Sequence, residues 1–184
     1  MFSDRQRKKL LYIARKSVEY AARGDYFTPE AEEDSELSSH SGAFVTIYKK
    51  SGDLRGCIGY IISDVPLYKT IAMVARAAAL NDPRFNKLSE DELSDIYLDI
   101  SVLSIPEEIS DIKDIQVGRD GMIISHKSKQ GLLLPQVAEK YGWSRENFLE
   151  ETCRKAGLPA LAWQWDDIII KTFSAEVFGE SGNS

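Results

Sequence analysis

Residues 43–62 read AFVTIYKKSGDLRGCIGYII, and this stretch predicts a β-hairpin. The segment from Ala43 to Tyr48 alternates and is rich in residues that favour strands. Ser51-Gly52 supplies a turn, and the chain returns from Leu54 to Ile62 with apolar side chains at every second position. The second arm contains the hexapeptide Leu54-Arg55-Gly56-Cys57-Ile58-Gly59. A hairpin that carries a glycine-flanked cysteine is therefore the first expectation.

The segments that flank this hairpin show helical spacing. A helix is predicted to begin near Ser3 and to stop at Gly24, because its apolar residues recur at intervals of three and four. A second helix is predicted from Pro66 to the break at residues 81–83. Ser89-Glu90-Asp91-Glu92 has the form of a capping box for a short helix. The acidic stretch of residues 25–36 lacks Lys and Arg and is expected to be a solvated loop.

The rest of the chain predicts further strands and helices in no regular alternation. Strands are expected at residues 96–102, 121–126, 131–134 and 168–178, and helices at residues 135–141 and 144–156. No segment repeats, and strands do not alternate with long helices, which argues against a solenoid and against a doubly wound parallel sheet. The expected class is α+β with antiparallel hairpins.

Composition excludes several classes of function. The chain of 184 residues carries a formal net charge of −6, so its overall field repels nucleic-acid phosphates. With two cysteines far apart and two histidines, it lacks the ligand clusters of a zinc site, and we expect no metal and no cofactor. No apolar run approaches the roughly 20 residues of a membrane span. A cytoplasmic protein of one domain, residues 1–184, with free thiols is expected.

Cys57 is the first candidate for chemistry. A thiol beside glycine backbone can act as a nucleophile, with backbone N–H groups nearby to receive developing charge, and Arg55 could stabilise its thiolate. A Cys-His pair would need His40 or His126 as the base. The alternative is that Cys57 only fills space as a small apolar residue, a role that we also expect for Cys153. The residues alone leave both readings open.

A second candidate lies at the end of the second predicted helix. Asp82-Pro83-Arg84-Phe85 places an acid and an arginine around a fixed turn, and Arg84 could bind an anionic group there. The alternative is a helix stop in which Asp82 pairs with Arg84 and Phe85 plugs an apolar gap. Both alternatives remain open on the sequence.

The hexapeptide of residues 54–59, in its context, closely resembles the signature of the AMMECR domain family. Further pieces agree with that family in the same order along the chain. They are residues 42–46, 82–85, 100–103, 117–121, 131–138 and 153–159, and the resemblance extends from about residue 8 to residue 178.

The resemblance implies an α+β domain in two lobes. Each lobe is expected to be an antiparallel sheet with flanking helices, and the hexapeptide is expected to face a cleft between them. The family pattern carries over onto these candidate site residues: Cys57 as nucleophile, and Arg55, Gly56, Gly59, Asp82, Arg84 and Phe85 as binding residues. It also implies partners, namely a Memo-like protein and a radical S-adenosylmethionine enzyme, because prokaryotic relatives are often encoded beside them.

Two functions follow from this resemblance. In the first, the chain is a cysteine-dependent enzyme or enzyme subunit that acts on a small molecule, with Arg55 or Arg84 binding the anionic part of the substrate. In the second, it is a noncatalytic module that binds a protein or a small ligand at the same cleft, with nucleic acid disfavoured by the net charge.

Overall fold

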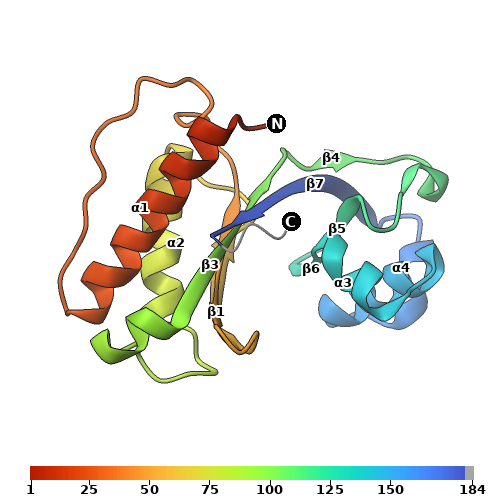
Figure 1. Cartoon of the computed structure of the whole chain (residues 1–184). Helices are drawn as coiled ribbons and strands as arrows, with labels where there is room; N and C mark the ends of the chain where they lie inside the picture. The colour runs from red at the N-terminus through yellow and green to blue at the C-terminus, as the bar shows by residue number, and fades with distance from the viewer. Residues whose placement is uncertain (181–184) are drawn as a thin grey trace. The chain divides into compact units, whose positions relative to one another are not determined.

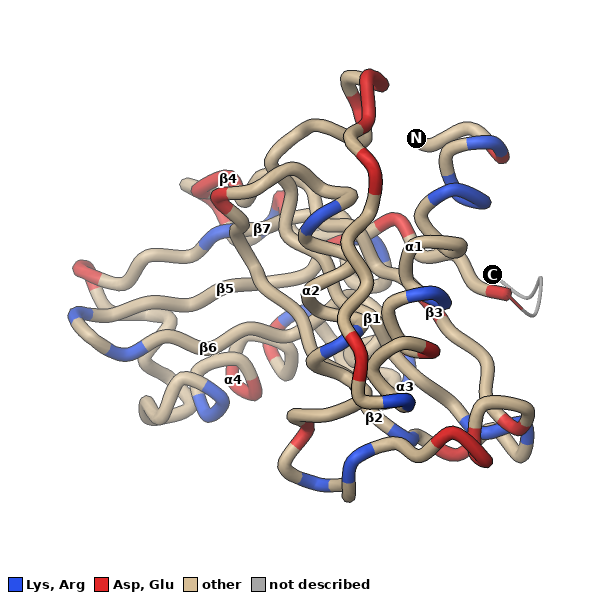
Figure 2. Tube along the Cα trace, turned by 90° about the vertical axis from the view of Figure 1, so that its left-hand side faces the viewer, with Lys and Arg blue, Asp and Glu red and all other residues tan. Residues whose placement is uncertain are grey.

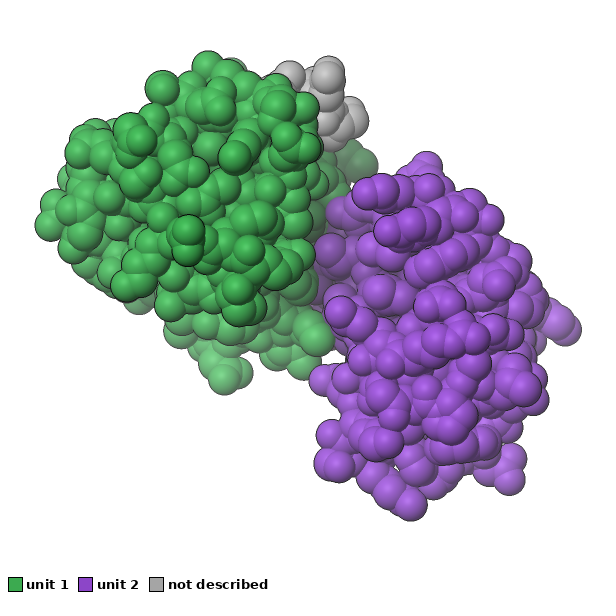
Figure 3. Space-filling model, turned by 90° about the horizontal axis from the view of Figure 1, so that it is seen from below, with its two compact units in different colours: residues 1–102, 176–184 green, residues 103–175 purple. Residues whose placement is uncertain are grey.

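A computed structural model describes residues 1–180 and divides the chain into two compact units (Figure 3). Unit 1 contains residues 1–102 and the C-terminal segment that begins at Glu176, and unit 2 contains residues 103–175. The hairpin, the helices and the strands expected from the sequence are all present. The fold class is α+β with antiparallel strand pairing, as the sequence predicted.

Unit 1 is built on the predicted hairpin. β1 (Ala43–Lys49) pairs antiparallel with β2 (Leu54–Tyr60) on one side and with β3 (Ile96–Leu103) on the other. Val45 lies opposite Ile58 of β2 and Ile100 of β3. The strand order is β2-β1-β3-β7, where β7 is Ile169–Gly179, and it leaves β2 at the end of the sheet.

Two helices cover one face of this sheet. α1 (Asp4–Ala22) and α2 (Leu67–Leu80) lie side by side against it (Figure 1). Val45 and Ile47 of β1 are fully buried on that face, because alternate side chains of a strand point to the same side. Thr46 and Tyr48 therefore belong to the opposite face, where they are half-buried. α1 begins with the capping box of Ser3 and Gln6, and the acidic stretch 25–36 has no helix or strand.

Unit 2 has its own core, and its strands continue the order of the sheet as β7-β5-β6, where β5 is Asp120–His126 and β6 is Lys129–Leu133. β5 pairs antiparallel with β6 and with β7, and the short β4 (Glu107–Glu108) pairs with the other edge of β7. The unit also contains η2 (Ile112–Asp114), α3 (Pro135–Tyr141), α4 (Arg145–Lys155) and η3 (Ala160–Gln164). Cys153 of α4 is fully buried in this core, as expected, and burial raises the pKa of its thiol. None of the helices in residues 1–180 combines the length and the apolar character that a membrane crossing requires.

Candidate functional site

The two sequence motifs meet at the outer edge of β2. Because β2 ends the sheet, one side of its backbone has no neighbouring strand among residues 1–180. Asp82, which follows α2, occupies part of that side, and its Oδ2 accepts a hydrogen bond of 2.8 Å from the backbone N–H of Cys57. Asp82 is only 4% exposed. The hexapeptide and the segment Asp82-Pro83-Arg84-Phe85 are therefore held together by one buried carboxylate.

The same carboxylate holds the side chain of Arg84. The guanidinium donates from Nε to Asp82 Oδ1 at 2.9 Å and from Nη2 to Oδ2 at 2.7 Å. The backbone N–H of Arg84 also donates to Oδ1, at 3.1 Å. Arg84 holds the pKa of Asp82 well below its usual range, although burial opposes this shift. With 54% of its side chain exposed, Arg84 is a fixed cation at the surface.

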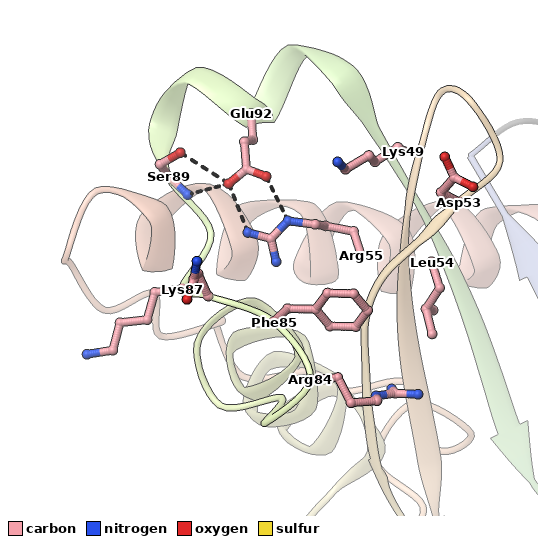
Figure 4. A pocket seen from close by; sticks show the side chains of 10 residues that line it. Lys49, Asp53, Leu54, Arg55, Arg84, Phe85, Lys87, Ser89 and Glu92 are labelled. Atoms are coloured by element: carbon pink, nitrogen blue, oxygen red, sulfur yellow. Dashed lines mark hydrogen bonds and ion pairs between the residues drawn. The ribbon is translucent and has the colours of Figure 1, made fainter.

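Arg55 has a different environment from Arg84. Ile47 pairs with Gly56 and Tyr48 pairs with Leu54, so Arg55 is the extra residue of a β-bulge. Arg55 is 7% exposed and donates from Nε and Nη2 to the two carboxylate oxygens of Glu92, at 2.7 and 2.9 Å (Figure 4). Glu92 lies in η1 (Glu90–Asp95).

Glu92 has two roles: it completes a capping box with Ser89 and it pairs with Arg55. Its Oε2 accepts hydrogen bonds from the backbone N–H and the hydroxyl of Ser89, which completes the predicted capping box. The hydrogen bonds from Arg55, helped by those from Ser89 and opposed by burial, lower the pKa of Glu92 to about 2. The capping box therefore also supplies the counter-ion of a buried arginine.

A pocket of about 720 Å³ opens between these groups. Its lining comes from the β1–β2 hairpin and from the segment between α2 and β3: Lys49, Asp53, Leu54, Arg55, Arg84, Phe85, Asn86, Lys87, Ser89 and Glu92. The ring of Phe85 has the guanidinium of Arg84 at 5.5 Å and that of Arg55 at 5.8 Å from its centre (Figure 4). Phe85 is half-buried, so it is a wall of the pocket rather than a core plug.

The charge of this pocket differs in sign from that of the chain. Four of its lining side chains are basic and two are acidic, whereas the whole chain carries −6. Figure 2 shows residues of both signs interspersed along the chain. The basic surplus is therefore a local property of this pocket. An anionic group would be attracted to it over a short range.

Cys57 lies on β2 beside this pocket but does not line it. Its side chain is half-buried, and its Sγ accepts a hydrogen bond of 3.2 Å from the hydroxyl of Thr46. The backbone N–H of Cys57, a candidate donor for an anionic intermediate, is already bonded to Asp82. His40 is exposed in the segment before β1, and the imidazole of His126 pairs with Asp167 within unit 2.

Gly56 and Gly59 allow close packing within the chain. A Cβ on Gly56 would lie 2.3 Å from the carbonyl oxygen of Ala78 in α2. A Cβ on Gly59 would lie 2.2 Å from the ring of Phe44. Both glycines are thus required by contacts between β2 and its own neighbours. The contact at Gly56 holds β2 against the last turn of α2, and Asp82 follows that helix.

The sheet face that bears Cys57 contains a polar cluster that sequence reasoning missed. Thr46 lies opposite Cys57 on one side and opposite Asp99 of β3 on the other. Oδ1 of Asp99 is buried without a hydrogen-bond partner among the described residues. Burial, and then the charge of Glu180, raise the pKa of Asp99. Strand alternation predicted which side chains share a face, but only the pairing of β1 with β3 brings Asp99 beside Thr46.

The pocket also contains residues that sequence analysis did not propose as site residues. Lys49 and Asp53 come from the hairpin, and Lys87 and Glu92 come from the segment that follows Phe85. The capping-box pattern indicated Glu92 as a helix residue but not as the partner of Arg55. Within residues 1–180, no group of three or more His, Cys, Asp or Glu side chains is placed to hold a metal ion.

The fold and this site define a class: an α+β protein whose hairpin carries the Leu-Arg-Gly-Cys-Ile-Gly sequence beside an arginine pocket. The family model of AMMECR1 matches residues 11–178, which is most of the chain. The chain belongs to the AMMECR1 family.

Similar proteins agree with this assignment. A protein of Pyrococcus furiosus is 40% identical over 181 residues, covering 93% of this chain and 86% of that protein. A protein of Saccharolobus solfataricus is 42% identical over 183 residues, covering 94% and 80%. The crystal structure of an uncharacterized protein from Pyrococcus horikoshii matches with a TM-score of 0.85 and 37% identity, covering 94% of this chain and 90% of that one.

Proposed function

We propose that this protein binds a small molecule through an anionic group, a phosphate or a carboxylate, in the pocket beside β2. The observation that carries the proposal is the half-exposed guanidinium of Arg84, which a buried carboxylate holds in place next to an aromatic ring. A fixed guanidinium binds an oxyanion with little loss of side-chain freedom. Arg84 is therefore the residue that contacts the anion.

The other basic residues contribute in different ways. Arg84 uses Nε and one Nη2 hydrogen for Asp82, and its remaining N–H groups are available to a ligand. Arg55 is neutralised by Glu92 and is buried, so its role is to support Phe85 rather than to bind the anion. Lys49 and Lys87 add positive charge at the pocket without such a fixed geometry.

Calorimetric titration with inorganic phosphate and with citrate tests this function. We expect saturable binding of at least one probe, and Arg84→Ala should weaken it about tenfold because a charge-assisted contact is lost. The matched control is Arg119→Ala, since Arg119 is 55% exposed and is also paired with a buried aspartate, Asp120 of unit 2. Equal affinity for wild type and Arg84→Ala, or no saturable binding of either probe, would contradict the proposal.

A cysteine-dependent enzyme is the second candidate function, and the hydrogen bond from Thr46 to the Cys57 sulfur favours it. A hydroxyl that donates to sulfur stabilises the thiolate, which is the nucleophilic form. The anion at Arg84 would then be part of the substrate. If Cys57 does not react with iodoacetamide until the protein is denatured, this candidate is lost and the binding function stands alone.

We extend the proposal to two protein partners, a Memo-like protein and a radical S-adenosylmethionine enzyme. The resemblance to the AMMECR domain family implies them. A pull-down of each from the same source organism is the test. Association that Arg84→Ala abolishes and Cys57→Ser preserves would support the use of this pocket as a partner surface. Absence of association with both proteins would contradict the extension.

A further inference from the structure

Two groups beside the pocket, the backbone N–H of Cys57 and the guanidinium of Arg84, share one carboxylate. Oδ2 of Asp82 accepts from the Cys57 backbone N–H at 2.8 Å and from Arg84 Nη2 at 2.7 Å. Asp82 is 4% exposed, so water cannot solvate its charge well, and Arg84 is the cation that neutralises it. Any ligand that draws on the same guanidinium changes the electrostatic environment of Asp82, and with it that of Cys57.

The distance over which this change acts is short. The N–H that Asp82 binds belongs to Cys57 itself, so the thiol of that residue lies within electrostatic range of the shared carboxylate. Burial of Asp82 keeps the local dielectric constant low, and charges interact more strongly there than in water. The thiolate, not the thiol, reacts with electrophiles, so the net charge around Cys57 controls its reaction rate.

We infer that Asp82 couples the pocket to Cys57, so that an anion bound to Arg84 slows the reaction of the Cys57 thiol. This inference rests on the proposed function and adds regulation to the same site. In the free protein Arg84 balances Asp82. With an anion bound, the guanidinium is shared between Asp82 and the anion. The excess negative charge beside Cys57 then disfavours the thiolate.

The test is the rate of iodoacetamide alkylation at Cys57 in the intact wild-type protein, followed by mass spectrometry of the two cysteine peptides. Cys153 is fully buried and serves as an internal control for folding, because it reacts only if the protein opens. Rates are measured with and without saturating inorganic phosphate, with chloride as the anion at matched ionic strength. We expect phosphate to slow Cys57 about threefold or more.

Three variants separate this coupling from other effects. Arg84→Ala should react slowly without phosphate and should not respond to it, whereas Arg84→Lys should recover part of the lost rate because the charge is kept. Asp82→Asn should react faster than wild type, since its amide oxygen still accepts the Cys57 N–H while the negative charge is gone. A variant in which Cys153 also becomes reactive has lost its fold. The remaining variants and the wild-type comparison with and without phosphate then test the coupling.

The outcomes for binding and for coupling are distinguishable because calorimetry measures phosphate binding under the same conditions. If phosphate binds and the Cys57 rate is unchanged, the coupling is wrong and the proposed function stands. If phosphate does not bind, both are wrong. A Cys57 that is inert in the folded wild-type protein also overturns the coupling. An unchanged rate in Asp82→Asn removes Asp82 from the mechanism.

Discussion

Asp99 is a single residue whose charge works against folding. Burial and the nearby charge of Glu180 raise its pKa in the folded protein, and its Oδ1 has no partner within the described residues. The stability associated with protonated Asp99 is therefore complete below its unfolded pKa and is lost as the pH rises through its folded pKa. We expect Asp99→Asn to increase the free energy of unfolding near pH 7 by about 1 kcal/mol.

Urea unfolding of wild type and Asp99→Asn near pH 7 and near pH 4 measures this effect. The gain should shrink at the lower pH, because protonation then neutralises Asp99 in the wild type as well. Asp166→Asn is the control, since Asp166 is exposed on the surface of unit 2. A loss of stability near pH 7 would contradict this prediction, because it would show that Asp99 is stabilising as a carboxylate.

Glu92 shows the opposite behaviour at the same scale. Its pKa is lowered to about 2, first by the hydrogen bonds from Arg55, so its contribution is present above its unfolded pKa and is lost as the pH falls toward 2. Glu92→Gln leaves the buried Arg55 guanidinium without a counter-ion, and we expect a loss of about 2 kcal/mol near pH 7.

The difference between wild type and Glu92→Gln should be smaller near pH 3, where the wild-type carboxylate begins to be protonated. Chemical denaturation at both pH values measures it. Glu90→Gln is the matched control, because Glu90 forms an exposed pair with Arg23 and should change stability little. A similar loss in Glu90→Gln and Glu92→Gln would mean that the pairing with Arg55 contributes nothing specific.

At the scale of elements, the contact between β2 and α2 sets the geometry of the pocket. A Cβ on Gly56 would lie 2.3 Å from the backbone oxygen of Ala78, which is held in the last turn of α2. Gly56→Ala must therefore move β2 away from α2, and we expect a loss of about 3 kcal/mol. The movement would also strain the hydrogen bond between Cys57 and Asp82.

Thermal unfolding of Gly56→Ala and Gly52→Ala checks this prediction. Gly52 lies in the β1–β2 turn at φ +92° with open space around it, so alanine there meets backbone strain but no clash. We expect a loss of about 1 kcal/mol for Gly52→Ala. If the two variants lose equal stability, close packing between β2 and α2 is not the reason for Gly56.

At the scale of the whole molecule, the net charge limits which anions the pocket accepts. The chain carries −6, whereas the pocket lining has more basic than acidic groups. A small anion meets mainly the field of the pocket, while a polynucleotide also meets the repulsion of the rest of the surface. We expect no binding of a single-stranded RNA of about 20 nucleotides at about 150 mM salt.

Fluorescence anisotropy of a labelled RNA with the full chain tests this prediction. Calorimetry with inorganic phosphate in the same buffer is the positive control. RNA binding that Arg84→Ala abolishes would identify the pocket as a nucleic-acid site despite the net charge. RNA binding that the variant leaves unchanged would locate a basic surface elsewhere on the chain.

Local patterns in the sequence determined most of the secondary structure. The alternation in residues 43–62 predicted β1 and β2, and helical spacing together with Ser3 and Gly24 predicted α1. The capping box at Ser89 and the burial of Cys153 could also be predicted from the sequence, because the first depends on residues close together in the chain and the second on one helix face. The sequence also determined the family, through motifs that lie in order along the chain.

Only the tertiary structure decided how those motifs act together. Arg55 and Cys57 are two residues apart, yet the bulge directs Arg55 to Glu92 while Cys57 bonds to Thr46 and Asp82. Asp99 joins Thr46 through the pairing of two strands that are far apart in sequence. A sequence pattern records local spacing, whereas hydrogen bonding and charge compensation depend on distances that exist only after the chain has packed.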